Sequence, residues 1–142
     1  MLLLDPDARV LLLSGVDPAR PGQPPIWFPV GGGVEPGETI EEAAIREVKE
    51  ETGLVISGLG PVVMTRQVEF EFDGDHYDQD ETYFAVRTTV FVPDSKGWTE
   101  TEQRVMVGPK WWSLDELRTT KEIIYPERLA DLLDQVLRSE VS

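Results

Sequence analysis

Three glutamates near the end of one short segment are the residues from which chemistry could be built. Glu47, Glu50 and Glu51 belong to the stretch GGGVEPGETIEEAAIREVKEETGLV, residues 31–55, which holds seven glutamates, two basic residues and no aspartate. If the stretch forms a helix, a rotation of about 100° per residue puts the three carboxylates on one arc of adjacent turns. Carboxylate oxygens grouped in this way are hard ligands, which suit Mg²⁺ or Mn²⁺ better than zinc.

The position of these glutamates is unfavourable without a cation. Like charges four residues apart destabilise an exposed helix by about 0.2–0.5 kcal/mol per pair. The helix dipole disfavours anions in the last turns by roughly 0.3–1 kcal/mol each. A divalent cation bound by the three carboxylates would remove both penalties and gain binding energy. The alternative interpretation is that the glutamates form a solvated charged face of the helix. An apolar stripe borders the arc and argues against that alternative; it comprises Ile40, Ala44, Ile45 and Val48, and the small Ala43 leaves space above the carboxylates.

Local signals at both ends favour a helix over residues 40–52. Thr39 and Glu42 are spaced as a capping box, and Gly53 suits the left-handed position that ends many helices. Before the helix, the glycines of GGGVEPGE predict a turn whose backbone can approach a ligand closely. That turn alone is a weak signal, because many surface turns are equally rich in glycine.

Together, the turn and the helix resemble the Nudix box in full. The resemblance is weaker outside the box, in IWFPVGGG before it and in QDETYF and KWWSLDEL after it, but it spans most of the chain. One departure is Val30, where many members carry proline, and we expect it to affect the turn more than the chemistry. The residues that match the motif at its spacing are Gly32, Glu38, Arg46-Glu47-Val48, Glu50-Glu51 and Gly53-Leu54.

The resemblance implies a metal-dependent hydrolase that uses Mg²⁺ or Mn²⁺ and water to cleave a nucleoside diphosphate linked to another group. Glu50 and Glu51 match the metal-binding pair of the family. Glu47 matches a glutamate that helps to hold metal and acts as the base toward the attacking water, and Gly31 matches the position whose backbone carbonyl often ligates metal. The residues that match the structural support of the box are Glu38, Arg46, Gly32 and Gly53.

In this family, a further glutamate from a distal loop often completes the site. The segment GWTETEQRV offers Glu100 and Glu102, and it precedes a tryptophan-rich strand as the resemblance leads one to expect. We favour Glu102 as this second catalytic residue. The alternative is that both side chains are solvated.

The sequence restricts the substrate only by exclusion. It lacks the proline spacing of ADP-ribose pyrophosphatases, the tyrosine of diadenosine polyphosphate hydrolases and the motifs of the NADH and coenzyme A subfamilies, which leaves a nucleoside triphosphate or a modified nucleotide. A second hypothesis is a nucleotide sensor or binding module without turnover, but such modules usually lose box glutamates and none is lost here. Candidates for substrate contact are Trp27, Phe28, Tyr83 and Phe84, which could stack on a base, and Arg66, which could reach a phosphate; the alternative for each is ordinary packing or a surface position.

Composition narrows the class of partner. A net charge of −14 repels phosphate backbones and anionic lipids, so we expect neither non-specific nucleic-acid binding nor membrane binding. With only 13 basic residues, a metal ion is the natural bridge between an acidic pocket and a small nucleotide substrate. The chain has no cysteine, which excludes disulfides and thiolate sites and fits a cytoplasmic location. MLLL is too short for a signal peptide or a membrane span, and a homodimer stays open.

The order of predicted elements indicates an α/β fold, an α/β/α sandwich with a mixed sheet, in a single domain over residues 1–142. We expect two short strands around the turn at DPD, a proline-rich loop over 16–25 and a strand in IWFP. Residues 62–72 alternate as a half-buried strand, and the acidic segment 73–81 is predicted to be a connection. Further predicted elements are strands at 82–92 and 104–112, a short helix opened by Ser113 and Glu116, and a last helix over 125–140.

Overall fold

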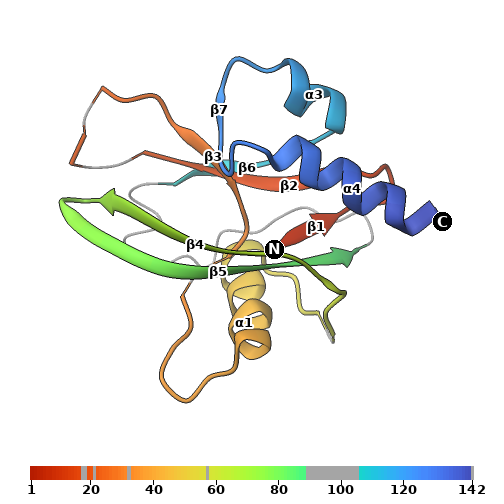
Figure 1. The fold of residues 1–142 in the computed structure, drawn as a ribbon, viewed down its shortest axis with the longest axis horizontal. Coiled ribbons are helices and arrows are strands. Elements are labelled where there is room, and N and C mark those ends of the chain that lie inside the picture. Colours follow the sequence, from red (N-terminus) through yellow and green to blue (C-terminus); the bar gives the residue numbers. More distant parts are fainter. Residues whose placement is uncertain (17–18, 21, 32, 57, 89–105, 142) are drawn as a thin grey trace.

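The computed structural model describes residues 1–16, 19–20, 22–31, 33–56, 58–88 and 106–141 (Figure 1). Its helices are α1 (Ile40–Thr52), α3 (Leu114–Thr119) and α4 (Leu129–Val141). Its strands are β1 (Leu2–Leu4), β2 (Val10–Gly15), β3 (Ile26–Pro29), β4 (Val62–Phe72), β5 (Asp75–Arg87), β6 (Met106–Trp112) and β7 (Ile123–Ile124).

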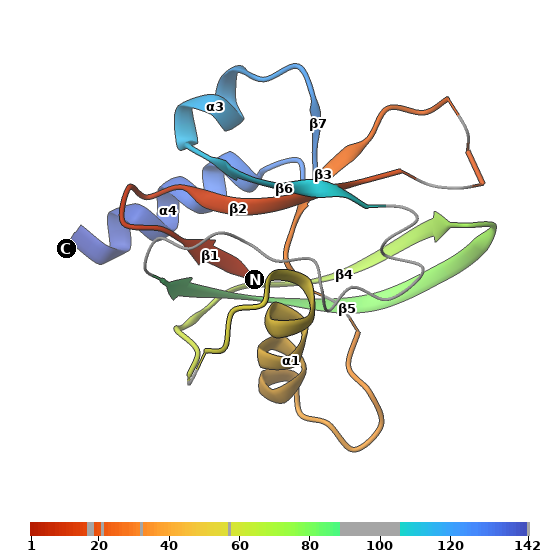
Figure 2. The same cartoon turned by 180° about the vertical axis from the view of Figure 1, so that it is seen from behind.

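The strands form one mixed sheet in the order β4-β5-β1-β2-β3-β7, and β6 pairs with β2. The β1–β5 and β3–β7 pairs are parallel, and the others are antiparallel. Figures 1 and 2 show α1 on one side of this sheet and α3 and α4 on the other. The predicted α/β/α sandwich with a mixed sheet is therefore confirmed.

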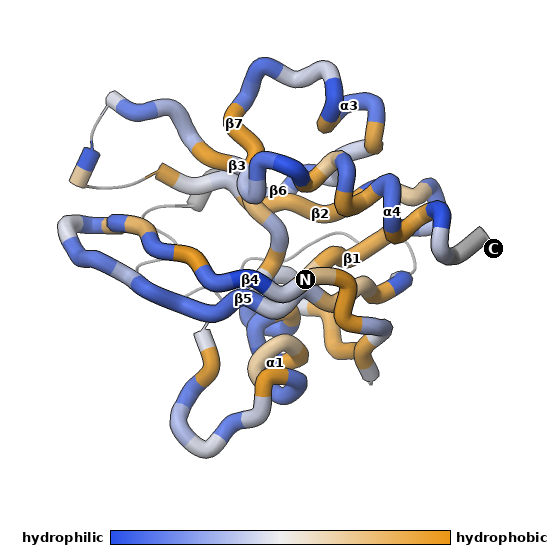
Figure 3. The backbone as a smooth tube through the Cα atoms, viewed as in Figure 1, coloured by the Kyte–Doolittle hydropathy of each residue, from blue (hydrophilic) through white to orange (hydrophobic). Residues whose placement is uncertain are grey.

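The central strands β1 and β2 supply two separate cores because successive side chains of a strand point to opposite faces. One face carries Leu2, Leu4 and Leu12 into a core shared with Leu129 and Leu133 of α4. The residues between them serve the other face: Leu3, Leu11 and Leu13 pack with Val48 of α1. Figure 3 shows this apolar centre, and it shows hydrophilic residues along the outer part of the β4–β5 hairpin.

The acidic segment 73–81 is not the predicted connection, because nearly all of it belongs to β5. The turn is confined to Asp73 and Gly74, which both have positive φ (51° and 83°). An Asp-Gly pair of this kind fits a two-residue hairpin, and the acidic residues then pair in register with β4. Backbone pairing outweighs the low strand preference of aspartate at these exposed positions. The predicted half-buried strand at 62–72 is confirmed, and from residue 64 onward its even positions are less exposed than its odd ones.

The C-terminal region differs from the prediction at the start of the last helix. The chain forms strand β7 at Ile123–Ile124, which pairs with β3, and the Tyr125 N–H that follows donates to the Trp27 carbonyl at 2.8 Å. α4 begins only at Leu129, whose N–H bonds to the Pro126 carbonyl at 3.0 Å. The short helix after Ser113 is confirmed as α3, with its capping box. The predicted strands at 82–92 and 104–112 lie partly outside the described residues. Among the helices described, none has the length and apolar character needed to cross a membrane.

Candidate active site

Helix α1 packs against the sheet mainly through its C-terminal half. The helix begins at an N-cap, Thr39, with its capping box to Glu42 complete, and it ends at Gly53 with φ of 80°, as predicted. Figure 1 shows the loop before α1 reaching away from the sheet, so the first turn is the more exposed one. The predicted apolar stripe is therefore partly wrong: Ile40 is 48% exposed, whereas Ala43 is buried.

Glu51 is consequently buried, with only 1% of its surface exposed, and does not merely border the apolar face. The Gly31 N–H donates to its Oε1 at 3.1 Å, which ties the carboxylate to the turn that follows β3. Just before that turn, Val30 is fully buried, and its carbonyl accepts a hydrogen bond from the Met1 amino group at 2.8 Å. The turn is thus fixed from both sides, and it holds one carboxylate at the inner end of the helix.

Arg46 joins the loop before α1 to the helix. Its guanidinium binds Glu38 through two hydrogen bonds, Nε to Oε2 at 2.7 Å and Nη2 to Oε1 at 2.9 Å. Nη2 also donates to the Gly33 carbonyl at 2.9 Å. The Arg46 fork lowers the pKa of Glu38 to about 2, helped by the Glu35 N–H, which donates to the same carboxylate. The pair matched to the structural support of the box is therefore in direct contact.

The same guanidinium also binds two of the candidate metal ligands. Arg46 Nη1 donates to Glu47 at 2.8 Å and to Glu50 at 3.2 Å. Burial raises the pKa of Glu47, while contacts with Arg46 and Glu51 oppose that rise. Within the described ranges, no three acidic or histidine side chains are grouped closely enough to hold a metal ion. The positive charge of Arg46 thus offsets the repulsion between the Glu47 and Glu50 carboxylates.

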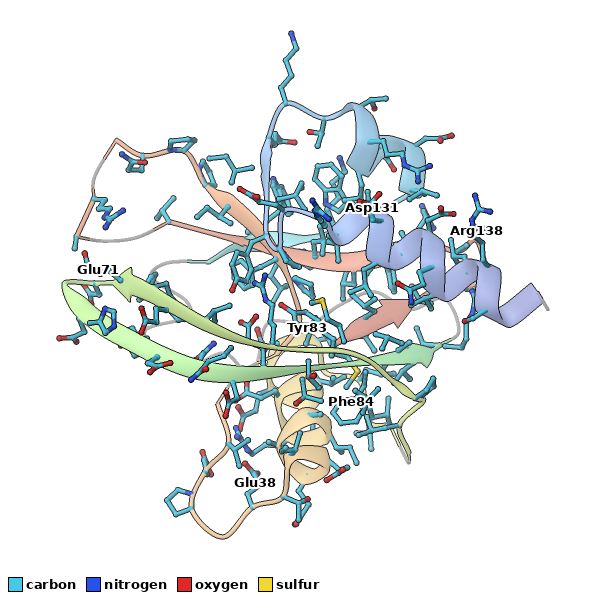
Figure 4. All side chains as sticks on the ribbon, in the orientation of Figure 1. Glu38, Glu71, Tyr83, Phe84, Asp131 and Arg138 are labelled. Atoms are coloured by element: carbon cyan, nitrogen blue, oxygen red, sulfur yellow. The ribbon has the colours of Figure 1, made fainter. Side chains whose placement is uncertain are left out.

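The candidate substrate-binding aromatic residues are divided between the two faces of the sheet. Tyr83 and Phe84 are adjacent in β5 and buried, and Figure 4 shows them pointing to opposite sides of the strand. Phe84 belongs to the core beside α1, and Phe28 packs against that core. For these two rings, the structure shows core packing, which was the alternative to base stacking. Trp27 is half-buried on the other face, where its ring meets Trp112 edge to face at 5.3 Å.

Arg66 and Tyr83 share a partner, Glu81, that was not predicted from the sequence. Glu81 lies directly opposite Arg66 in the β4–β5 pair and accepts a hydrogen bond from its Nε at 2.8 Å. The Tyr83 hydroxyl donates to Glu81 at 3.1 Å, and the Tyr125 hydroxyl donates at 3.2 Å. Opposite charges at facing strand positions are the signal that could have found this pair, but it requires the hairpin register.

Three of the predicted site residues cannot be placed. Gly32, Glu100 and Glu102 lie outside the described residues. Among the described residues, the carbonyl of Gly31, the candidate backbone ligand, accepts no hydrogen bond, while its N–H donates to Glu51.

Known proteins match this chain in sequence and in fold. The family model of the NUDIX domain matches residues 1–133. The chain belongs to the Nudix family. This Nudix protein is similar to the oxidized purine nucleoside triphosphate hydrolase of Mus musculus, with 36% identity over 91 residues, 64% of this chain and 51% of the mouse protein. It also resembles the nucleoside triphosphatase NudI of Salmonella heidelberg, with 48% identity over 63 residues, 42% of this chain and 43% of that protein. Each match thus spans about half the length of the relative or less.

Solved structures support the fold at lower identity. The MutT protein from Methanosarcina mazei superposes with a TM-score of 0.66 at 22% identity, covering 99% of this chain and 91% of that one. A C. elegans Ap4A hydrolase superposes with a TM-score of 0.63 at 20% identity, covering 99% and 95%. At this identity, the likeness concerns the fold alone.

Proposed function

We propose that this Nudix protein is a divalent-metal-dependent hydrolase that cleaves a pyrophosphate bond in nucleoside triphosphates or modified nucleotides. The observation that carries the proposal is the buried Glu51 carboxylate, held by the Gly31 N–H at the inner end of α1 beside Glu47. A charged glutamate at this position does not stabilise the helix, because the helix dipole and the neighbouring negative charge both disfavour its carboxylate. The names of the mouse and Salmonella relatives support a nucleoside triphosphate as substrate.

The residues present fit a Mg²⁺ ion in the chemistry of their donors. Glu47, Glu50 and Glu51 offer carboxylate oxygens from two successive turns of α1, and the Gly31 carbonyl adds a neutral oxygen nearby. Arg46 now contacts Glu47 and Glu50, so it would have to yield these oxygens or share them. Its hold on Glu38 and Gly33 would keep the loop in place meanwhile. A bound Mg²⁺ supplies charge neutralisation on the phosphates and a lowered pKa for a coordinated water.

Glu47 is the residue that we assign as the proton acceptor. Its pKa is raised by burial, which makes it a better base than an exposed glutamate. As the water oxygen bonds to phosphorus, its proton passes to the Glu47 carboxylate, and the bridging P–O bond breaks with its electron pair leaving on the departing phosphate. The chain needs no protein nucleophile for this reaction, since positioning and charge stabilisation carry most of phosphoryl transfer. The second catalytic role of Glu102 is proposed from the family resemblance alone.

The test is turnover of a nucleotide panel in the presence of Mg²⁺, scored by product identity. We expect nucleoside triphosphates to give a nucleoside monophosphate and pyrophosphate, with Glu51→Gln reducing the rate by orders of magnitude. Glu41→Gln is the matched control, because Glu41 is an exposed glutamate in the first turn of the same helix. Tight nucleotide binding with no turnover of any member of the panel would instead favour the sensor or binding module.

A further inference from the structure

Strand β4 lies at one end of the sheet and presents an open edge. In the strand order it is the terminal member, and among the described strands it pairs with β5 alone. The backbone hydrogen bonds that the described residues make in turns and loops do not involve residues 62–72. The strand therefore offers backbone donors and acceptors along one side, and an edge of this kind can pair with another chain.

The outer part of the β4–β5 hairpin is a ribbon of only two strands. β1 pairs with β5 at residues 85–87, so residues 75–81 of β5 have no second strand partner in the described part of the chain. Figure 1 shows the hairpin reaching well beyond β1. A two-stranded ribbon is marginally stable by itself in water, whereas a third strand stabilises it. A strand added at β4 would supply what this part of the sheet lacks.

The two faces of the ribbon differ in chemistry. Residues that pair across an antiparallel ribbon point to the same side, so Phe70 and Tyr77 share a face, where their rings stack at 5.2 Å. Val68 and Phe72 follow on the same face, because the side chains of a strand alternate. The opposite face carries exposed carboxylates, which belong to Glu69, Glu71, Asp78 and Asp80.

The acidic face already binds a basic side chain from another segment. Arg20 lies in the loop between β2 and β3, and its Nη2 is 3.2 Å from Oε2 of Glu71. Both side chains are more than half exposed, so the pair contributes little to stability and can be exchanged for a similar one. The contact shows that a guanidinium from outside the hairpin fits against this face.

A second copy of the chain is a poor occupant for the β4 edge. Each copy carries a net charge of −14, and pairing β4 with itself would place the acidic faces of both copies side by side. Like charges on neighbouring strands are destabilising, whereas opposite charges stabilise the pairing. The charge of this edge therefore favours a basic partner over another copy of the chain.

We propose that the β4 edge binds an extended segment of a partner protein in which basic and apolar side chains alternate. Added as a strand, the segment places its basic side chains beside Glu69 and Glu71 and its apolar ones beside Phe70 and Phe72, because the side chains of a strand alternate between the two faces. Backbone hydrogen bonds supply affinity, and the alternating side chains supply specificity. The surface is separate from the glutamates of α1, so this inference does not rest on the proposed function.

The experiment titrates the whole protein into a short, end-capped, fluorescently labelled peptide in which lysine and valine alternate. The comparison peptide has the same composition, with its lysines and valines in separate blocks. We expect the alternating peptide to bind at least ~10-fold more tightly at the same salt concentration, because only this order matches both faces of the added strand. Hydrogen exchange should slow in residues 62–72 when the alternating peptide is bound.

Charge reversal at the edge tests the residues. Glu69→Lys combined with Glu71→Lys should weaken the alternating peptide at least ~10-fold, because two favourable cross-strand pairs become repulsive. Glu41→Lys combined with Glu127→Lys is the matched control, since it changes the net charge equally at exposed positions on α1 and before α4. The control should leave the affinity nearly unchanged. If the β4 variant does not fold, Glu69→Gln with Glu71→Gln replaces it: a reduced affinity supports the inference, and an unchanged affinity refutes it.

Several outcomes would overturn the inference. Equal affinity for the alternating and block peptides would show charge attraction without strand addition. An equal loss in the control variant would show that the net charge, and not the edge, attracts the peptide. Protection from exchange outside residues 62–72 would place the peptide elsewhere. Self-association of the protein that the peptide reverses would assign the edge to a second copy of the chain.

Discussion

Replacing Glu51 with glutamine should stabilise the protein in the absence of metal, although Glu51 is one of its most deeply buried residues. Glutamine keeps the shape of the side chain, and its carbonyl oxygen can still accept the Gly31 N–H. Its amide can donate to Glu47, which is in contact with Glu51. The substitution therefore removes a charge without removing a hydrogen bond.

The magnitude follows from the two penalties that the charge incurs. The unfavourable interaction with the end of α1 is worth about 0.3–1 kcal/mol, and repulsion from Glu47 four residues earlier adds roughly 0.2–0.5 kcal/mol. Together they give about 0.5–1.5 kcal/mol in the free energy of unfolding. For a chain of 142 residues, that corresponds to an increase of about 2–5 °C in Tm.

The assay is thermal unfolding with and without Mg²⁺. Wild-type Tm should rise with millimolar Mg²⁺, by the equivalent of about 2.7 kcal/mol at a hundredfold excess over Kd. Glu51→Gln should start higher and respond much less. The control Glu41→Gln should lower the metal-free Tm, because Glu41 lies in the first turn of α1, where the dipole favours anions. Its Tm should still rise with Mg²⁺ as that of the wild type does. A lowered metal-free Tm for Glu51→Gln, or a metal response like that of the wild type, would show that Glu51 is neither a destabilising charge nor a metal ligand.

The other predictions concern the base, the loop and the helix end. Glu47→Gln should lower kcat by about 10²–10⁴-fold at saturating Mg²⁺ with little change in substrate affinity; steady-state kinetics that show equal kcat would exclude Glu47 as the base. Glu38 has a pKa lowered to about 2 from 4.5, so its contribution to stability is present above pH 4.5 and is lost as the pH falls through 2. The difference in unfolding free energy between the wild type and Glu38→Gln should therefore be largest near neutral pH and vanish toward pH 2; a constant difference would contradict the Arg46 contact. Gly53→Ala places a side chain at φ of 80° and should cost about 1–2 kcal/mol in chemical denaturation, with a neutral result arguing against this helix end.

The sequence predicted α1 well because its signals are local. Thr39, Glu42 and Gly53 act within a few residues of each helix end, so their effect does not depend on the rest of the fold. The Arg46–Glu38 contact followed from the family motif, since the two residues are eight positions apart and belong to the helix and to the loop before it. The same locality explains the short helix α3 and its capping box.

The features that were missed depend on pairing between distant segments. Strand β5 carries acidic residues with low strand preference, and only its register with β4 makes it a strand. The burial of Glu51 follows from the angle at which α1 meets the sheet, which the helical period alone cannot give. The contacts of Glu81 join β4, β5 and the segment before α4, so the sequence spacing alone could not show that Tyr125 lies beside Arg66.

Metal-dependent hydrolysis at phosphorus can be measured directly by product analysis after incubation of a nucleoside triphosphate with the protein in ¹⁸O-labelled water and Mg²⁺. We predict metal-dependent release of a nucleoside monophosphate and pyrophosphate, with the label on a phosphate product and not on the ribose. The folded Glu51→Gln variant, compared at the same concentration, should release almost none. Label on the ribose, or equal product from Glu51→Gln, would contradict the proposal that a box-held metal ion directs water to phosphorus.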